Sequence, residues 1–290
     1  MSKVKIITDS NSGFLQEEGK KLGVEVIPMP FTINDIDYLE EINISQDKFY
    51  TLLKDDPEIF TSQPPLGVLQ DVWETNLKNY DEIVFIPMSS GLSGTCQSSI
   101  LLSKDYNDKV QVVDNKRISV TQKESVMEAV TLASLGKSAK EIKEQLEKTA
   151  EQSSIYIMLN TLKYLKRGGR ISPAAAAIGT MLKIKPILTS RGGKFEKFAM
   201  SLSTAQGKKR MISQIKKEIE TEFKDFYEKG KVTLSVAHTQ NEVEAEKFKE
   251  EILKEFPKAI FRYVNPLSLS VSCHIGPGAL AIALSVNNTL

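Results

Sequence analysis

The sequence carries almost no net charge and has few of the residues that mark disulfide-linked or metal-binding proteins. Its 38 Lys and Arg residues are balanced by 37 Asp and Glu residues, a formal charge of +1, so no overall field draws the chain to nucleic acid. Only two cysteines are present, Cys96 and Cys273. They are too few and too far apart for a disulfide framework or a CxxC metal site, and we expect both to be structural. We expect no metal and no cofactor.

Long apolar runs and a targeting segment are also missing. The apolar stretch from Gly278 to Val286 is shorter than the roughly 18 to 20 residues that a membrane helix requires. Stable membrane insertion is therefore not expected, although transient membrane contact stays open. Residues Met1 to Asp9 lead directly into a strand-like run, without the basic, apolar and small-residue regions of a signal peptide. These absences predict a cytoplasmic protein.

The first half of the chain alternates short β-branched runs with helix-like segments. Helix starts are predicted at Ser45, at Pro64-Pro65, and at Ser138 with Glu141, which form a capping box. Strands separated by helices predict a parallel sheet with right-handed crossovers. Ligands of such sheets bind beyond the carboxyl ends of the strands. The predicted strands are Val4 to Ile7, Val24 to Ile27, Ile83 to Ile86 and Val110 to Val113.

The pattern changes after about Ser153, and the second half predicts an α+β domain. Its expected elements are a strand at 155–159, helices at 160–166 and 172–182, a hairpin of 184–190 with 195–202, a helix at 207–229, a strand at 232–237, a helix at 241–256 and a strand at 260–264. Pro277 suits the first turn of a final helix. We therefore predict an α/β protein of two domains, 1–153 and 154–275, with a C-terminal helix over 276–290 completing the first domain and a cleft between the two.

Three small polar segments stand at the ends of predicted strands or before predicted helices. They are Thr8-Asp9-Ser10, Thr61-Ser62-Gln63-Pro64, and the run from Ser89 to Thr95. A strand that enters a Ser/Gly/Thr loop and then a helix exposes backbone N–H groups at a positive dipole end, which suits a phosphate or a carboxylate. Each segment alone is better explained by ordinary turn and cap preferences. Three of them on one sheet edge favour an anion site.

The run Gly91-Leu92-Ser93-Gly94-Thr95 narrows the kind of anion. It lacks the lysine of a P-loop, so binding of a nucleoside triphosphate is not expected. It also departs from the G-x-S-x-G nucleophile elbow, because Thr95 stands in place of the second glycine. The order Ser93, Asp114, His274 still matches a hydrolase. A serine hydrolase acting on a lipid or acyl ester through Ser93 and His274 therefore remains the alternative.

The chain has two histidines, and their settings differ. His274 lies in a glycine-rich segment just before the predicted final helix, where it can donate a hydrogen bond to an anion. His238 follows a predicted strand and is expected to be structural. A basic set in the second half is a candidate surface for an acidic partner or a phosphate, with a solvated face as the alternative; it comprises Lys183, Arg191, Lys194, Lys197, Lys208, Lys209 and Arg210.

Taken together, these motifs resemble the DegV family over essentially the whole chain. The family includes the FakB proteins, which bind fatty acids and present them to a separate kinase, FakA, for conversion to acyl phosphates used in bacterial phospholipid synthesis. The resemblance implies a two-domain fold with a ligand cleft or tunnel, and a lipid-binding carrier that is not itself an enzyme. The matching segments are Thr8-Asp9-Ser10, Thr61 to Pro64, Ser89 to Thr95, Asp114, Gly168 to Ile171, Lys185-Pro186-Ile187 and His274 to Ala279.

The resemblance also implies partners and site residues. The partners are a long-chain fatty acid and a FakA-like fatty acid kinase, and no nucleic acid. Arg170, in the family's Gly-Gly-Arg pattern, is a further candidate for the ligand, the phosphate or the domain interface, with a structural ion pair as the alternative; Ser10 is another candidate. No catalytic residue is expected. The residues implied to hold the carboxylate are Thr61, Ser62, Ser93, Gly94, Thr95 and His274.

Overall fold

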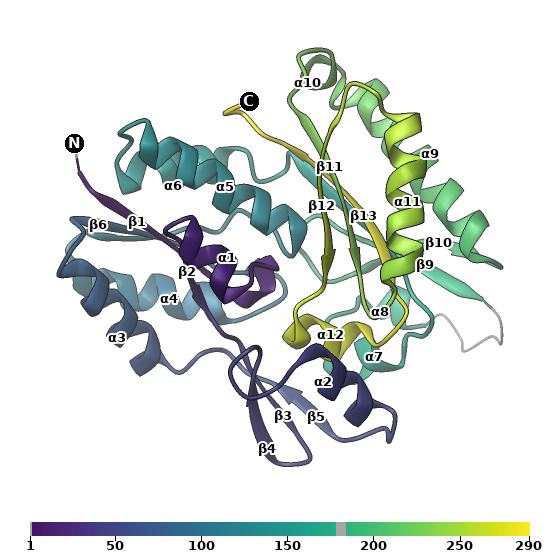
Figure 1. Cartoon of the computed structure of the whole chain (residues 1–290), viewed down its shortest axis with the longest axis horizontal. Coiled ribbons are helices and arrows are strands. Elements are labelled where there is room, and N and C mark those ends of the chain that lie inside the picture. The colour runs from purple at the N-terminus through teal and green to yellow at the C-terminus, as the bar shows by residue number, and fades with distance from the viewer. Residues whose placement is uncertain (1, 178–183) are drawn as a thin grey trace. The chain divides into compact units, whose positions relative to one another are not determined.

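The computed structural model describes residues 2–177 and 184–290 (Figure 1). The chain divides into two compact units. The first comprises Met1–Glu151, Ser268–Ser270 and Thr289, and the second comprises Gln152–Leu267, Val271–Asn288 and Leu290. No helix within residues 2–177 and 184–290 is both long enough and apolar enough to cross a membrane.

A parallel four-stranded sheet forms the centre of the first unit, as the alternation of strands and helices predicts. Its strand order is β2-β1-β6-β7, and each neighbouring pair runs parallel. The strands are β1 (Val4–Asp9), β2 (Glu25–Ile27), β6 (Glu82–Ile86) and β7 (Val110–Val112).

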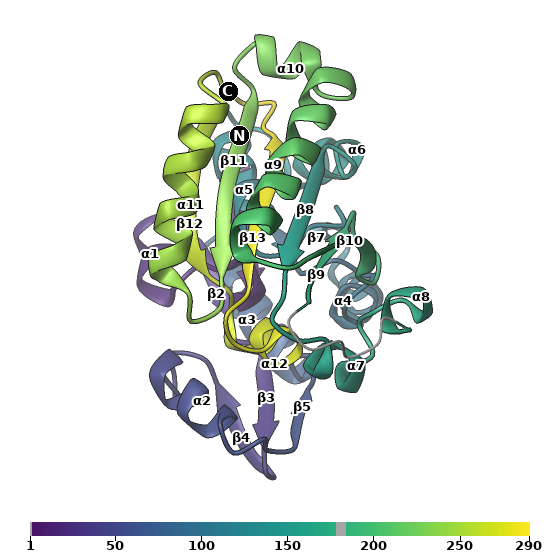
Figure 2. The same ribbon diagram turned by 90° about the vertical axis from the view of Figure 1, so that its right-hand side faces the viewer.

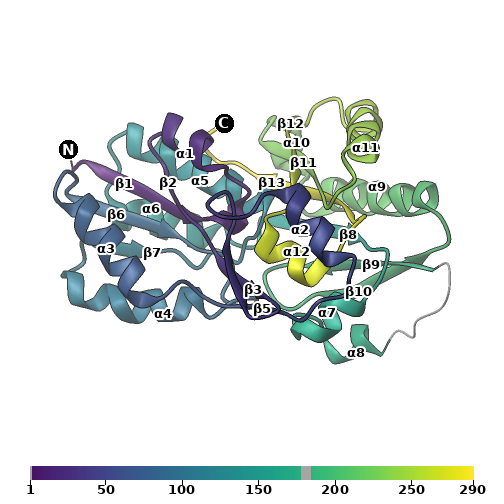
Figure 3. The same cartoon turned by 60° about the horizontal axis from the view of Figure 1, so that its bottom comes forward.

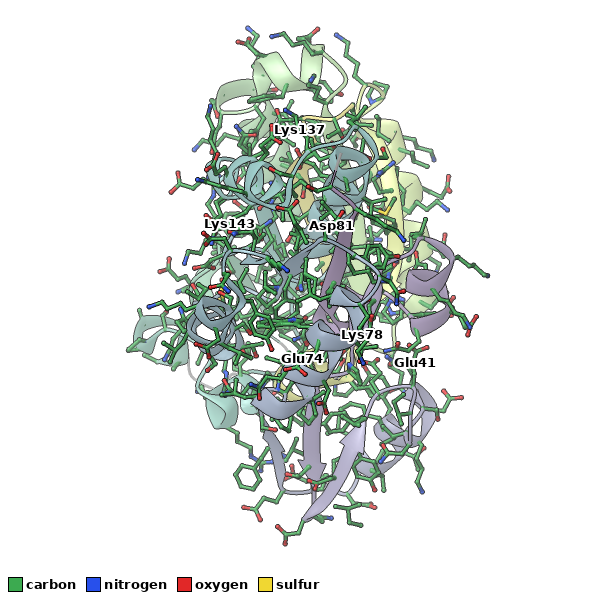
Figure 4. The ribbon with its side chains drawn as sticks, turned by 90° about the vertical axis from the view of Figure 1, so that its left-hand side faces the viewer. Glu41, Glu74, Lys78, Asp81, Lys137 and Lys143 are labelled. Atoms are coloured by element: carbon green, nitrogen blue, oxygen red, sulfur yellow. The ribbon has the colours of Figure 1, made fainter. Side chains whose placement is uncertain are left out.

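Helices cover both faces of this sheet (Figure 1). Because successive side chains of a strand point to opposite faces, Val84 packs with α5 and α6 while Phe85 packs against Trp73 of α3 on the other face. Lys143 on α6 donates to the carbonyl of Val112 at 2.7 Å (Figure 4). The helices are α1 (Gln16–Lys21), α3 (Leu66–Leu77), α4 (Thr95–Ser103), α5 (Val120–Ser134) and α6 (Ala139–Lys148), with short 3-10 turns at Ser10–Ser12 and Lys104–Tyr106.

The predicted helix starts of this unit are confirmed. Ser45 accepts a hydrogen bond from the Lys48 amide at the start of α2 (Gln46–Leu53). Ser138 and Glu141 form the reciprocal capping box of α6. The helix predicted after Pro64-Pro65 is α3. α5, in contrast, was not predicted from the sequence.

A small antiparallel sheet in the first unit was also not predicted. It has the order β4-β3-β5, with β3 (Pro30–Ile33), β4 (Ile36–Leu39) and β5 (Ile59–Thr61). Asn34 and Asp35 have φ of 47° and 62°, which suits the tight turn between β3 and β4. Phe49 of α2 packs edge-on against Phe31 of β3 at 5.7 Å between ring centroids. Figure 3 shows β3 and β5 side by side. This sheet places Thr61 at the end of β5.

The second unit is built on a six-stranded mixed sheet of order β10-β9-β8-β13-β11-β12. β11 and β12 are parallel, and the other neighbours are antiparallel, including the predicted hairpin of β9 with β10. The strands are β8 (Ser153–Met158), β9 (Lys185–Ser190), β10 (Glu196–Ser201), β11 (Val232–His238), β12 (Ile260–Pro266) and β13 (Leu280–Val286).

Helices α9 (Thr204–Thr221) and α11 (Glu242–Glu255) lie side by side and pack against this sheet (Figure 2). Met211 and Ile215 of α9 and Phe248 of α11 are buried in one core with residues of β8, β11 and β13. The helix predicted at 207–229 is in fact two, α9 and α10 (Lys224–Glu228), with Phe223 buried between them.

The predicted C-terminal helix over 276–290 is wrong. This segment contains β13, a central strand of the second sheet, in which all seven residues from Leu280 to Val286 are buried. A strand that is buried on both faces has a continuous run of apolar residues. The periodicity of such a run cannot distinguish the strand from a buried helix. Pro277 lies between Gly276 and Gly278, whose φ values of 75° and 80° form a turn instead of a helix start.

Two further helices of the second unit differ from prediction. The helix expected at 160–166 is α7 (Lys163–Gly168). The helix expected at 172–182 is described only as α8 (Pro173–Ala176), because residues 178–182 lie outside the described residues. An additional helix, α12 (Leu269–Ile275), begins in residues of the first unit and ends in residues of the second.

Candidate functional site

The loop after β6 folds back on itself around Ser89. The Ser89 amide donates to the carbonyl of Arg117 at 2.9 Å, and the Ser89 hydroxyl accepts from the Gly91 amide at 3.2 Å. The Ser93 amide in turn donates to the carbonyl of Ser89 at 3.2 Å. These bonds give the loop one defined path, which ends at the first residue of α4.

Ser93 and Thr95 bring two hydroxyls together at the start of α4. Their oxygens are 2.9 Å apart, and the Thr95 amide donates to Ser93 Oγ at 3.2 Å. Gly94, the N-cap residue, supplies no side chain to cap the helix. One of these hydroxyls donates to the other, so the pair keeps one O–H donor, which lies next to the first-turn amides that follow Thr95 and with them suits an anion.

The segment after β5 lies beside this loop. Gln63 Oε1 accepts from the Ser98 hydroxyl of α4 at 3.0 Å, and a Cβ added to Gly94 would stand 3.3 Å from the same oxygen. The Ser62 amide donates to the carbonyl of Pro30 at 3.3 Å. The first unit thus joins the predicted segments of Thr61-Ser62 and Ser93 to Thr95 through Gln63. Gln63 belongs to the segment Thr61-Ser62-Gln63-Pro64 but was not predicted as a site residue.

Asp9 anchors the entrance to the Ser93 loop. Its fully buried carboxylate accepts from the Met88 amide at 2.8 Å, the Asn11 amide at 3.0 Å and the Gln122 side chain at 3.1 Å. Burial raises the pKa of Asp9 to about 6, although these hydrogen bonds oppose the shift. The hydroxyl of buried Ser10 accepts from the Met29 amide at 3.1 Å. In this segment both side chains hold the backbone of neighbouring elements.

We expect Asp9 to make stability depend on pH. Because its pKa is raised from 3.8 to about 6, its contribution is fully present below about pH 4 and is lost as the pH rises through 6. Between these two limits of pH, the contribution of Asp9 to the free energy of unfolding falls by about 3 kcal/mol. To test this, the free energy of unfolding of wild type and of Asp9→Asn is measured by denaturant at each pH, and the gap between the two proteins should change with pH. A constant difference would assign the buried carboxyl an ordinary pKa.

His274 does not precede a helix as predicted. It lies in the last turn of α12, because the segment that follows is a turn and a strand instead of a helix. Burial, together with the nearby Arg170 charge, lowers the pKa of His274 to about 4. The ring is therefore neutral at neutral pH and offers one N–H donor.

Gly168, at the end of α7, lies against the His274 ring. A Cβ at this position would overlap Nδ1 of the ring, so the residue has to be glycine for His274 to keep its place. Arg170 Nη1 donates to the Gly168 carbonyl at 2.6 Å. The second unit therefore brings His274, Gly168 and Arg170 together. The sequence showed a Gly-Gly-Arg pattern but not this contact.

The glycine-rich turn after His274 is held by Thr239. Thr239 Oγ1 donates to the Gly276 carbonyl at 2.6 Å and accepts from the Ala279 amide at 2.9 Å. The Thr239 carbonyl accepts from the Gly278 amide at 2.7 Å. These hydrogen bonds were not predicted, because no sequence motif around Thr239 indicates them. His238 is buried, and its Nδ1 accepts from the Asn241 amide before α11, which agrees with the predicted structural role.

The hydrolase alternative is not favoured. Asp114 Oδ2 pairs with Lys116 Nζ at 2.6 Å, and Oδ1 accepts from the Ser90 amide at 3.3 Å. Burial raises the pKa of Asp114, but the hydrogen bonds from Lys116 and Ser90 outweigh it and leave a net lowering. Asp114 is thus paired with Lys116 and Ser90, whereas the Asp of a catalytic triad holds the histidine.

Part of the predicted basic surface is neutralised by acidic partners. Arg191 pairs with Glu222 at 2.8 Å and with Glu218 at 3.2 Å. Lys208, only 6% exposed, contacts Glu244 and Glu251, each at 2.6 Å. Lys183 lies outside the described residues, and the remaining four are exposed: Lys194, Lys197, Lys209 and Arg210. Within residues 2–177 and 184–290, no group of three or more His, Cys, Asp or Glu side chains is arranged to hold a metal ion.

Comparison with known proteins identifies the family. A family model described as "Uncharacterised protein, DegV family" matches residues 3–287. A DegV domain-containing protein of Staphylococcus aureus (strain N315) is 31% identical over 289 residues, covering 98% of this chain and 99% of the relative.

Solved structures agree with this match. The structure described as DegV, a fatty acid binding protein from Bacillus subtilis, has 30% identity and a TM-score of 0.83, covering 99% of this chain and 100% of the other. One described as fatty acid binding of a DegV family protein from Thermus thermophilus has 26% identity and a TM-score of 0.84, covering 98% and 99%. Because the family model spans nearly all 290 residues, the chain belongs to the DegV family.

Proposed function

We propose that this protein binds one long-chain fatty acid and presents its carboxylate to a separate, FakA-like fatty acid kinase. The observation that carries the proposal is the hydroxyl pair of Ser93 and Thr95 at the start of α4, where Gly94 supplies no side-chain cap, in a chain whose relatives include proteins described as binding fatty acids. Hydroxyls and the amides of a helix start both donate hydrogen bonds. A carboxylate or a similar anion is the kind of ligand that accepts several such bonds at once.

The head group would be gripped by the residues that the family resemblance implies. The hydroxyls of Thr61 and Ser93 and the neutral ring of His274 would each donate a hydrogen bond to the carboxylate. Backbone amides near Ser62, Gly94 and Thr95 would complete the shell. Arg170 and Ser10 are further candidates for contact with the ligand. None of these groups is proposed to catalyse a reaction.

The acyl chain would supply most of the affinity. Each buried methylene contributes about 0.8 kcal/mol, so a chain of about sixteen carbons gains roughly 12 kcal/mol before the cost of ordering it. The carboxylate site would therefore orient the ligand more than it holds it. This division of work suits a carrier, because the head group has to stay accessible to a second protein while the chain stays out of water.

The kinase would convert the carboxylate to an acyl phosphate for phospholipid synthesis. The partner transfers a phosphoryl group from a nucleoside triphosphate to a carboxylate oxygen and releases the diphosphate. Because acyl phosphates are reactive mixed anhydrides, a binding site that excludes water would slow their hydrolysis. The exposed Lys194, Lys197, Lys209 and Arg210 are candidate contacts for an acidic kinase surface. We place this carrier in the cytoplasm, with membrane contact at most transient.

Native mass spectrometry tests the binding proposal directly. The purified protein is expected to carry one fatty acid per chain, which denaturing solvent extraction releases for identification. A protein that is reproducibly empty, with a sugar or nucleotide in the extract instead, would contradict the proposal. Stoichiometric labelling of Ser93 by a serine-directed phosphonate would instead favour the hydrolase, because a hydroxyl that only binds has ordinary reactivity.

A further inference from the structure

Glu40 is a buried carboxylate that holds the first residue of a helix. It directly follows β4 and is 8% exposed. Its Oε2 accepts from the Leu269 amide at 2.8 Å, and its Oε1 accepts from the Gln46 side chain at 3.1 Å. Both carboxylate oxygens are therefore engaged, one of them with the backbone at the start of α12.

A second contact ties the same point of the chain to the first unit. The Ser268 hydroxyl donates to Asn11 Oδ1 at 3.0 Å, and the Asn11 amide donates to the Asp9 carboxylate. Two consecutive residues, Ser268 and Leu269, are thus fixed by side chains of the first unit. The start of α12 belongs to that unit, whereas the residues from Val271 onward belong to the second.

α12 carries His274 in its last turn. Five residues separate His274 from Leu269, which is a rise of roughly 7.5 Å along one short helix. A helix hydrogen-bonded along its length moves as a rod over this distance. Whatever fixes the Leu269 amide therefore also limits where the His274 ring lies.

We propose that Glu40 is a positioning residue for His274. Through the Leu269 amide it sets the position of α12 and so the direction in which the His274 ring presents its N–H. The consequence for fatty acid binding rests on the proposed function. The effect on the His274 ring does not, since it concerns the protein without ligand.

The chemistry of Glu40 argues against a purely stabilising role. Burial, helped by the neighbouring Glu41 charge, raises its pKa to about 7 against the opposing hydrogen bonds from Leu269 and Gln46. Its hydrogen-bonding partners, the Leu269 amide and the Gln46 amide group, are neutral. A buried carboxylate paired only with neutral groups costs stability, which a neutral Gln would avoid. Loss of its charge near neutral pH would weaken the bond to Leu269.

Nuclear magnetic resonance of the histidine ring nitrogens tests the proposal on the intact chain without added ligand. In wild type, the His274 signals should shift between about pH 6 and about pH 8, although the His274 ring itself stays neutral over that range. In Glu40→Gln the signals should be displaced at all pH values and should lose the part of the shift centred near pH 7, leaving only a change near pH 6 where Asp9 titrates. The matched control is Glu41→Gln, the same change at an exposed residue whose carboxylate accepts from the Gln16 amide (Figure 4). This variant should keep the His274 shift but move it to lower pH, because the Glu41 charge raises the Glu40 pKa.

Affinity for stearic acid gives the functional readout. Glu40→Gln should bind about tenfold more weakly than wild type at about pH 8, and Glu41→Gln should bind as wild type does. His274 signals that match wild type in Glu40→Gln would overturn the proposal. Should that variant fail to fold, Glu40→Asp replaces it, since its shorter side chain cannot reach the Leu269 amide in the same way, and His274 signals that match wild type overturn the proposal. If wild type does not bind stearic acid but its His274 signals still respond, the proposed function fails and the positioning role stands.

Discussion

Replacing both Thr61 and Ser93 by alanine is expected to weaken binding of stearic acid by about 10²- to 10⁴-fold. Each hydroxyl would lose a hydrogen bond to a charged acceptor, which contributes about 1.5–3 kcal/mol. Little volume is removed, since Ser93→Ala deletes one oxygen atom and Thr61→Ala deletes one oxygen atom and one methyl group. Isothermal titration with wild type, both single variants and the double variant measures the loss. Each single change should account for about half of it in free energy.

Ser103→Ala is the matched control for this experiment. Ser103 is the last residue of α4, and its hydroxyl donates to the carbonyl of Ile100 at 3.0 Å, far along the helix from Ser93. Its loss removes a hydroxyl from the same helix without touching the head-group loop, so affinity should not change. Unchanged affinity in the Thr61→Ala, Ser93→Ala double variant, with its melting temperature preserved, would remove both residues from the site.

The parts of the fold that the sequence predicted well depend on local patterns. The capping box of Ser138 and Glu141 is complete within four residues, and the strands of the first sheet are short β-branched runs between turn residues. β13 lacked such a pattern, because a strand at the centre of a sheet is apolar on both faces. The strands β3 to β5 were missed because their residues, which include Pro30, Thr32 and Asp37, form no β-branched apolar run between turn residues.

The candidate site divides in the same way. The hydroxyl loop around Ser93 was predicted because its residues are consecutive, and hydroxyls next to a helix start have a known chemistry. The position predicted for His274, just before a helix, was wrong because the segment that follows it forms a turn and the strand β13. Thr239 and Gly168 were missed because each acts on residues far away in sequence, and only folding brings them to the His274 segment.

Gly168→Ala is expected to displace the His274 ring. The added Cβ would overlap ring atom Nδ1, so either the ring or the end of α7 has to move. Overpacking of this kind costs about 1–3 kcal/mol of stability. If His274 donates to the carboxylate, the displaced ring loses that hydrogen bond, and affinity for stearic acid should fall about tenfold or more. Melting temperature, titration with stearic acid and the His274 ring signals are to be measured on one preparation.

Gly169→Ala separates this effect from backbone strain. Gly169 has a φ of +68°, so alanine there costs about 1 kcal/mol, but no atom lies within 4 Å of the added Cβ. This variant should melt at a lower temperature while its stearic acid affinity and His274 signals remain those of wild type. Equal losses of affinity in both variants would show that the end of α7 acts through stability alone. Wild-type affinity in Gly168→Ala, with the ring displaced, would withdraw His274 from the carboxylate site.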